Sequence, residues 1–345
     1  MLEIKRLDYY WYHKNPLAYL LLPLSWVFQF VVNLRRKAYQ LGIFAVHTLD
    51  TPVIVVGNIC VGGSGKTPLI IWLAEYLKAK GYKPGIISRG YGATDAGAPQ
   101  HVGPTSDPRR LGDEPVLLAQ RSGCPVVIDA NRPRAARTVA RGCDIILSDD
   151  GLQHYALGRT IEIAVVDDVR RFGNGFCLPA GPLRESLTRL QTVDLIVRNR
   201  GTTIDNDSKS PLVDGSEALL PASYDMHFIV VGIMNLQYED ICLQAADCLN
   251  KTVHAVAGIG FPERLFNQLR DLGMKVIEHA FPDHHDFTAA DLDFGDNRPI
   301  IMTEKDAVKC RRFAQAHHWY VSIKASLDES FAQHIISLVE RNKHG

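Results

Sequence analysis

The stretch VIVVGNICVGGSGKTP, residues 53–68, decides the fold of this chain. Four β-branched residues (Val53–Val56) are typical of a buried strand, and residues 69–78 are typical of a helix. A glycine-rich turn that ends in Lys66 and Thr67 joins them, which is the context of a P-loop. Backbone N–H groups of such a turn surround a phosphate, and the helix N-terminus adds partial positive charge. The residues that we expect to bind the nucleotide are Asn58, Val61, Gly62, Gly63, Ser64, Gly65, Lys66 and Thr67.

The loop departs from the usual P-loop pattern at one position. Cys60 stands where G-x-x-x-x-G-K-[ST] has its first glycine, and Gly62 and Gly63 supply the flexibility instead. Val61 stands where the partitioning ATPases carry an additional lysine, so membership of that group is not supported. We expect Lys66 to reach the β- and γ-phosphates of the nucleotide and the Thr67 hydroxyl to bind Mg²⁺.

Composition restricts the class of protein. The chain has 345 residues, which predicts two domains with an appendage. It is 46% hydrophobic and 22% charged, which excludes disordered and low-complexity classes. Lys+Arg and Asp+Glu both number 38, and this balance speaks against nucleic acid as a partner. The seven cysteines are scattered without a Cys-x-x-Cys pair, which fits a reducing compartment.

Strand-like and helical segments alternate after residue 50. This alternation predicts a doubly wound, mostly parallel α/β domain over residues 46–225. A smaller α/β domain is expected over residues 226–345, joined to the first by a short β bridge near residues 228–232. The expected strands are Val53–Val56, Gly85–Ser88, Val126–Asp129, Ile145–Ser148, Ile161–Asp167, Asp194–Asn199, Thr252–Ala257, Lys275–Ala280, Pro299–Thr303 and Trp319–Ile323.

Residues 1–45 form an apolar, basic N-terminal arm. Residues 15–34 carry no charge, and the arm holds six basic against two acidic residues. A membrane-spanning helix, an interfacial helix and a helix packed inside its own domain all remain open. A polar stripe on the apolar rod favours the interfacial, membrane-associated helix: Ser25, Gln29, Asn33, Arg36 and Gln40. In either membrane arrangement, the basic cluster at residues 35–37 favours the cytoplasmic side.

Polar residues also follow the predicted strands. Asp149 and Asp150 end an apolar strand, as a Walker B segment does, and one of them is expected to bind Mg²⁺. Because ligands of open α/β sheets lie beyond the carboxyl ends of the strands, other such residues should converge on the same cleft. They include Arg89, Tyr91, Asn131 and Arg132.

Three assignments stay open on the residues alone. Asp113 is either a helix N-cap or a carboxylate aimed at the cleft. Arg184 either stabilises charge on a transferring phosphoryl group or forms a surface ion pair. The segment 281–287, with His284, indicates either a metal site or a structural or catalytic support for a base.

Taken together, these motifs resemble the tetraacyldisaccharide 4′-kinase family of lipid A biosynthesis over essentially the whole chain. The matching elements are Trp11, Pro16, Gly57–Pro68, Ser88–Tyr91, Gly112–Pro115, Ser148–His154, Gly181–Glu185, Phe281–His284 and Thr303–Asp306. Leu152 departs conservatively from the family, in which an aromatic residue is common at this place.

The resemblance implies an ATP- and Mg²⁺-dependent kinase. Its acceptor would be the 4′-hydroxyl of tetraacyldisaccharide 1-phosphate, and its product the bis-phosphorylated tetraacyl precursor of lipid A. It further implies a monotopic position on the cytoplasmic face of the inner membrane, and no obligate protein partner is evident. The main alternative is a membrane-attached P-loop NTPase switch that acts on a protein partner.

The resemblance also implies roles for individual residues. Asp113 would be the catalytic base in a dyad with His284, while Lys66 and Arg184 would act on the phosphates. Metal binding would fall to Thr67, Asp149 and Asp150. Positions near the substrate would be Arg89, Tyr91, Asn131, Arg132 and Glu185.

Overall fold

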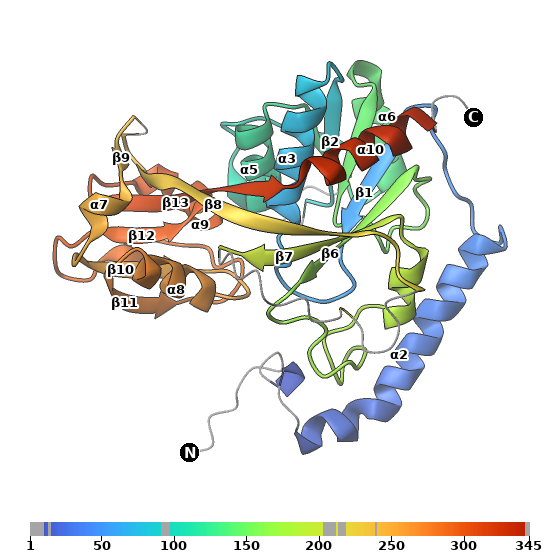
Figure 1. Cartoon of the computed structure of the whole chain (residues 1–345), viewed down its shortest axis with the longest axis horizontal. Helices are drawn as coiled ribbons and strands as arrows, with labels where there is room; N and C mark the ends of the chain where they lie inside the picture. The colour runs from blue at the N-terminus through green and yellow to red at the C-terminus, as the bar shows by residue number, and fades with distance from the viewer. Residues whose placement is uncertain are drawn as a thin grey trace.

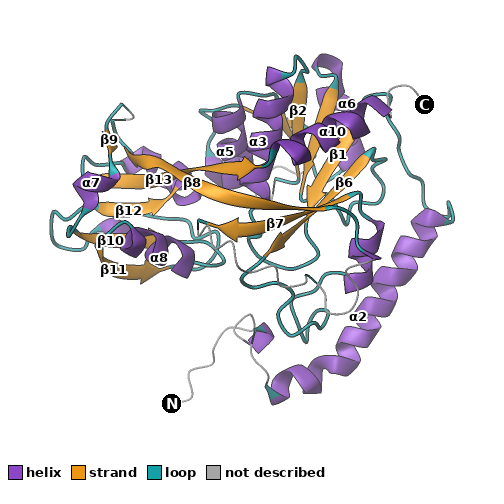
Figure 2. Cartoon of the chain, in the orientation of Figure 1, coloured by secondary structure: helices purple, strands orange, loops and turns teal. Residues whose placement is uncertain are grey.

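The computed structural model describes residues 10–12, 15–90, 97–202, 212, 219–238 and 240–341. Two α/β lobes share one continuous, mixed sheet, which is mostly parallel (Figures 1 and 2). The strand order is β11-β10-β12-β13-β8-β7-β6-β1-β5-β2-β4-β3, and β9 pairs with β8. The doubly wound fold class that the sequence predicts is thereby confirmed.

The first lobe contains the strand that precedes the P-loop. Its strands are β1 (Val53–Gly57), β2 (Pro84–Ser88), β3 (Gln100–Val102), β4 (Val126–Ile128), β5 (Ile145–Asp149), β6 (Ile161–Asp167) and β7 (Leu195–Gly201). All are parallel except β3, which runs antiparallel to β4. Its helices are α3 (Lys66–Ala79), α4 (Pro108–Leu111), α5 (Asp113–Ser122) and α6 (Arg132–Val139).

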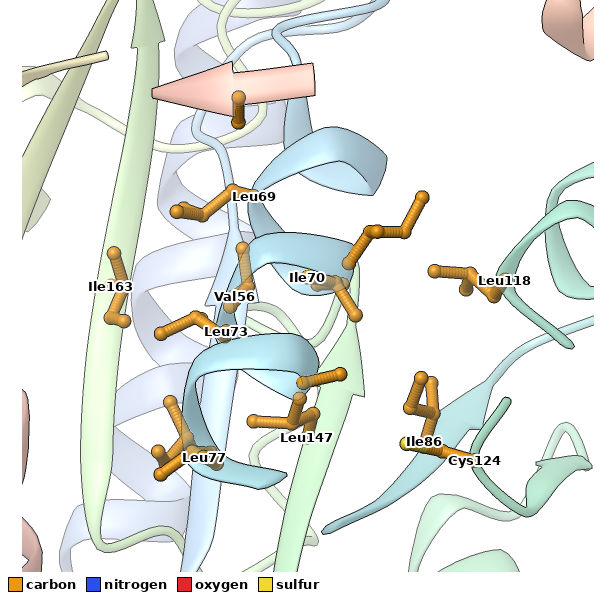
Figure 3. Packing of buried hydrophobic residues seen from close by; sticks show 14 of the residues in the cluster. Val56, Leu69, Ile70, Leu73, Leu77, Ile86, Leu118, Cys124, Leu147 and Ile163 are labelled. Carbon is orange, nitrogen blue, oxygen red and sulfur yellow. The ribbon is translucent and has the colours of Figure 1, made fainter. Parts of the chain in front are cut away.

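Hydrophobic cores cover both faces of this sheet, which explains why its strands read as continuous apolar runs. On one face, α3 and α5 pack over β1, β5 and β6 through residues such as Leu73, Leu118 and Ile163 (Figure 3). On the other face, α6 packs through Ala135 and Ala136. Alternate residues of β1 therefore serve different cores.

The second lobe is smaller. Its strands are β10 (Thr252–Ala257), β11 (Lys275–Ala280) and β12 (Ile300–Thr303), and β9 (Cys242–Leu243) lies at its edge. Its helices are α7 (Ala245–Cys248), α8 (Glu263–Asp271) and α9 (Glu304–Cys310). Short 3₁₀ turns occur at Ala140–Gly142 and Leu187–Thr192 in the first lobe, and at Ala289–Leu292 and Arg311–Phe313 in the second.

Two long antiparallel strands connect the lobes. β8 (Ser223–Asn235) and β13 (His318–Leu327) extend from one lobe into the other (Figure 1). The segment that we predicted as the bridge, residues 228–232, is the middle of β8. The proposed domain boundary at residue 225 therefore falls inside a strand. The last helix, α10 (Glu329–Arg341), packs on the first lobe, where Phe331 joins the same core as Leu73.

The N-terminal helix α2 (Pro16–Gln40) runs along the outside of the first lobe (Figure 1). Among the described residues, it is the one helix long and apolar enough to cross a membrane. Only Ala18, Ser25 and Ala38 of its residues are buried, so the interpretation as a helix packed inside its own domain is wrong. Apolar side chains remain exposed along its outer face: Leu20, Leu24, Trp26, Val27, Phe30, Val31 and Leu34.

Candidate active site

The P-loop requires glycine at two of its positions. Gly65 caps the N-terminus of α3 with φ +93°, and a Cβ there would lie 2.6 Å from Nδ2 of Asn199. Gly62 has φ +103° and lies against the Arg170 guanidinium. At Cys60 no left-handed backbone occurs, so the glycine missing from the pattern is not needed there. Burial raises the pKa of the Cys60 thiol to about 12 despite the nearby arginines, which keeps it protonated.

A cavity of about 720 Å³ lies between the two lobes, in front of this loop. Most of the residues that the sequence singles out line it: Val61, Gly62, Gly63, Ser64, Gly65, Lys66, Thr67, Arg89, Asp113, Arg132, Asp149, Asp150, Arg184 and His284. Asn58, Asn131 and Glu185 do not line it, and Tyr91 lies outside the described residues. Sheet order brings these residues together, because β1, β2 and β5 are neighbours and end at the same edge.

Asp150 joins the two cationic residues that face the phosphate site. Its Oδ1 lies 3.5 Å from Lys66 Nζ, and its Oδ2 accepts a 2.9 Å hydrogen bond from Arg184 Nη1. Burial alone would raise the pKa of Asp150, but the charges of Lys66 and Arg184 outweigh it and lower that pKa strongly. Arg184 therefore does form an ion pair, but within the cavity and not on a remote surface. It lies with Lys66 on the wall of the cavity.

Asp149 has the features of a cation ligand. The residue is almost fully buried, and its Oδ2 accepts a hydrogen bond from Ser88 Oγ at 3.3 Å. Its Oδ1 is buried without a hydrogen-bond partner among the described residues. Burial and the negative charges of Glu114 and Asp150 raise the pKa of Asp149. A buried oxygen that lacks a partner beside a phosphate site fits Mg²⁺, which takes one or two carboxylates plus phosphate oxygens.

Together with Asp149, the residues that could hold Mg²⁺ are Thr67 and Asp150, which line the same cavity. In the described part of the chain, no three His, Cys, Asp or Glu side chains come together as a metal site of their own. All of residues 281–287 are described, so the interpretation of that segment as a metal centre is not supported. His285 instead contacts Asp291, with Nε2 and Oδ2 3.3 Å apart.

Asp113 and His284 face each other from different lobes. His284 Nδ1 lies 3.2 Å from Asp113 Oδ2, while Asp113 Oδ1 accepts a hydrogen bond from the N–H of Glu114. The N-cap of α5 is Gly112, so the interpretation of Asp113 as an N-cap is wrong. Asp113 is the first residue of the helix, and it lines the cavity. His284 has a left-handed backbone, φ +60°, which turns its ring toward the first lobe.

The charges around this pair keep Asp113 ionised. Burial would raise the pKa of Asp113, but the hydrogen bond with His284 and the charges of Lys305 and Lys309 lower it to about 2. The hydrogen bond with Asp113 in turn raises the pKa of His284. The carboxylate is therefore available as a proton acceptor or as an anchor for a protonated imidazole.

Sequence reasoning gave no site role to Lys305, which lies beside this pair. Its Nζ lies 3.0 Å from Glu114 Oε1 and 3.9 Å from Asp113 Oδ2, so it joins the second lobe to the first. Although burial opposes it, the charges of Glu114 and Asp113 raise the pKa of Lys305. A signal for Lys305 was present in the sequence, because the polar segment that contains it follows β12 and begins α9.

Two residues predicted to lie near the substrate, Glu185 and Asn131, form hydrogen bonds within the protein and do not line the cavity. Glu185 is 3% exposed and accepts hydrogen bonds from Gln153 Nε2, at 2.9 Å, and from the Tyr155 hydroxyl. Asn131 caps α6 through a 3.1 Å hydrogen bond from the N–H of Arg134. Arg132 does line the cavity, and it donates to the backbone oxygen of Asp149. A direct contact of Glu185 or Asn131 with substrate stays a prediction.

A P-loop on a doubly wound sheet, two acidic residues at the neighbouring strand end and a carboxylate–histidine pair facing them define an ATP-dependent P-loop phosphotransferase. The family model of the tetraacyldisaccharide-1-P 4′-kinases (LpxK) matches residues 17–340. The chain therefore belongs to the tetraacyldisaccharide 4′-kinase family, as its motifs predicted.

Individual relatives agree with this assignment. A tetraacyldisaccharide 4′-kinase of Nitrosococcus oceani is 49% identical over 96% of this chain and 94% of its own. That of Aromatoleum aromaticum is 47% identical over 97% of both chains. Among solved structures, LpxK from Aquifex aeolicus in complex with ATP is similar, with a TM-score of 0.75 and 26% identity over 94% of this chain and 99% of that one.

Proposed function

We propose that this chain transfers the γ-phosphoryl group of ATP to the 4′-hydroxyl of tetraacyldisaccharide 1-phosphate. The observation that carries the proposal is the convergence of Lys66, Arg184 and the Asp113–His284 pair on one cavity. Four functions that phosphoryl transfer needs are present there: a phosphate cradle, a cation site, positive charge and a proton acceptor. The relatives supply the acceptor, because they are named for it.

The Asp113–His284 pair would activate the acceptor hydroxyl. A new bond forms between the 4′-oxygen and the γ-phosphorus, and the bond from that phosphorus to the β–γ bridging oxygen breaks. The hydroxyl proton passes to the pair, in which Asp113 is the base and His284 orients and balances its charge. An alcohol is a weak nucleophile, so an aligned acceptor for its proton promotes the attack.

The phosphate side of the cavity would stabilise the charge that develops on the transferred group. Lys66 and Arg184 provide positive charge from within 3.5 Å of Asp150, which holds both side chains in place. Mg²⁺, when bound by Asp149, Thr67 and Asp150, neutralises charge on the β- and γ-phosphate oxygens. Arg89 and Arg132 line the cavity on the same side and are our candidates for contacts with the disaccharide.

A transfer assay tests this proposal. The enzyme is incubated with γ-labelled ATP, Mg²⁺ and tetraacyldisaccharide 1-phosphate in detergent micelles. We expect label in the lipid, and Asp113→Asn should lower kcat by about 10²- to 10⁴-fold. The matched control is Asp107→Asn, because the Asp107 side chain is 40% exposed and caps α4 outside the cavity. ATP hydrolysis without labelled lipid would instead support the NTPase switch.

We also propose that α2 attaches the enzyme to the membrane surface. Trp26 and Phe30 of its outer face are 63% and 66% exposed, an arrangement that is unfavourable in water. Part of the polar stripe lies on the side of the protein, where Ser25 Oγ donates to Cys177 O at 2.8 Å and Arg36 donates to the Thr192 hydroxyl. The outward apolar face thus needs an apolar partner, and the lipid substrate resides in one.

Contacts along the whole of α2 favour an interfacial helix over a spanning one. Ser25 also accepts from the N–H of Ala180, and Phe28 packs against a core of the first lobe. A spanning helix would be surrounded by lipid, whereas this one is fixed along one side to polar loops. The basic cluster Arg35–Lys37 would place the enzyme on the cytoplasmic face, where anionic lipid attracts it.

A further inference from the structure

Three consecutive carbonyls of the P-loop accept hydrogen bonds from side chains. Gly62 O accepts from Asn58 Nδ2 at 3.3 Å, and Gly63 O accepts from Arg170 Nη2 at 2.6 Å. Ser64 O accepts from Asn199 Nδ2 at 2.9 Å. The donors come from the loop itself, from the segment after β6 and from β7, so they converge from three places in the sequence.

These bonds determine the direction of the neighbouring amides. In a trans peptide, C=O and N–H point to opposite sides of the chain. Holding the oxygens of Gly62, Gly63 and Ser64 toward the protein therefore turns the N–H groups of Gly63, Ser64 and Gly65 the other way, out from these donors. A glycine-rich loop without such bonds has many conformations, and ordering it on binding a phosphate costs affinity.

Arg170 makes the most extensive of these contacts. It lies behind the loop rather than in the main cavity, and it lines a small recess with Tyr12 and Asn58. Its guanidinium lies 5.7 Å from the Tyr12 ring centroid and 5.3 Å from that of Phe261. Nη1 also lies 3.5 Å from Gly260 O of the second lobe. One planar cation thus contacts the N-terminal arm, the P-loop and the second lobe.

Asn199 is fully buried, and hydrogen bonds to both ends of its side-chain amide fix the orientation of that amide. Its Nδ2 donates to Ser64 O, while its Oδ1 accepts from the N–H of Gly201 at 3.0 Å. Because Oδ1 accepts from Gly201, the Nδ2 end of the amide faces the P-loop. The close approach of Nδ2 is also what excludes a side chain at position 65.

We propose that Arg170 and Asn199, together with Asn58, are positioning residues that hold the P-loop in its phosphate-binding conformation before the nucleotide arrives. This proposal rests on the assignment of ATP to the P-loop. It gives Asn58 an indirect part in nucleotide binding, and it adds two residues that the sequence motifs do not include. None of the three needs to touch ATP for its loss to weaken binding.

Nucleotide affinity without lipid tests the proposal. We would measure the Kd of a fluorescent ATP analogue with Mg²⁺, and then KM for ATP and kcat in the transfer assay. Arg170→Gln should raise Kd and KM about tenfold or more. The change in kcat should be smaller, because the hydrogen bond to Gly63 O is present in both the ATP complex and the transition state. Arg170→Lys should recover part of the loss, since one ammonium still reaches Gly63 O but lacks the planar contacts.

Asn199→Asp is the second arm, because it keeps the shape of the side chain and replaces the donor by an acceptor. We expect a higher Kd for this variant as well, with a circular dichroism spectrum like that of the wild type. Arg270→Gln serves as the control, since Arg270 pairs with Glu278 on the surface of the second lobe. Unchanged Kd in Arg170→Gln, or a Lys variant no better than the Gln variant, would overturn the proposal. Tight binding by a wild type that labels no lipid would refute the kinase function alone.

Discussion

At the scale of single residues, the environment decides what each carboxylate can do. Asp149 and Asp150 are neighbours in the sequence, yet burial and negative charge raise the pKa of one while Lys66 and Arg184 lower that of the other. Asp113 is buried too, and its cationic neighbours hold its pKa at about 2. Three aspartates in one cavity thus differ in how readily they take up a proton, which is the basis of the different roles that we propose for them.

The dyad gives folding stability a characteristic pH dependence. The pKa of His284 is raised in the folded protein by its hydrogen bond with Asp113, above the value of 6.5 for a free imidazole. Its contribution is therefore complete below about pH 6.5 and is lost as the pH rises through the folded pKa. We expect His284→Gln to lower Tm by a few degrees more at pH 6 than at pH 9.

A double variant distinguishes loss of the Asp113–His284 interaction from a general loss of stability caused by replacing His284. In an Asp113→Asn background the histidine has no carboxylate at that position to pair with, so His284→Gln should lower Tm by the same amount at both pH values. Scanning calorimetry of the four proteins at pH 6 and pH 9 provides the comparison. A pH-dependent difference that persists in the Asp113→Asn background would assign it to another partner of His284, such as Asp283.

At the scale of elements, α2 combines two functions on opposite sides. Its polar stripe predicted an amphipathic helix in the membrane interface. The structure shows that part of this stripe contacts the protein, and that the outer face is apolar. The stripe was visible in the sequence, but its partner was not, because a hydrogen-bonding side chain fits either headgroups or a neighbouring loop.

Charges on the outer face of α2 should detach the enzyme from membranes. We expect the double variant Trp26→Glu/Phe30→Glu to reduce binding to phosphatidylglycerol vesicles on the order of 100-fold or more, since each aromatic contributes about 1.5–3 kcal/mol on burial. Vesicle flotation measures the bound fraction. The control Asn33→Glu/Gln40→Glu adds the same charge to exposed positions of the polar stripe. Equal binding of both variants would refute docking through this face.

At the scale of the whole molecule, the active site exists only where the lobes meet. Asp113 and His284 are 171 positions apart, and Lys305 reaches Glu114 across the same junction. The last helix returns to the first lobe, where the Phe331 ring lies 5.5 Å from that of Trp72 and 5.3 Å from that of Tyr224. Helices α2 and α10, which are far apart in the sequence, thus both lie against the lobe that carries the P-loop.

Loss of the Phe331 ring should destabilise that lobe. Phe331 is fully buried, so we expect Phe331→Ala to lower the free energy of unfolding by about 3–5 kcal/mol. Urea unfolding followed by tryptophan fluorescence reports on it, because Trp72 is a direct neighbour. Gln333→Ala on the exposed side of α10 should change stability by no more than about 0.5 kcal/mol. Similar values for both variants would mean that α10 adds little to this core.

The sequence by itself determined what depends on near neighbours along the chain. β-Branched runs specified the strands, the Gly-Ser-Gly-Lys-Thr segment specified the P-loop, and the combined motifs identified the family. These follow from local backbone preferences and from side-chain patterns that a few adjacent residues express.

Only the tertiary structure decided what depends on distant parts of the chain. It placed His284 against Asp113, turned Arg170 and Asn199 onto the P-loop carbonyls and returned α10 to the first lobe. Such contacts depend on strand order and on how two lobes share one sheet. A hydrogen bond between residues more than 100 positions apart leaves no periodic mark in either segment, because each residue type also occurs in unrelated surroundings.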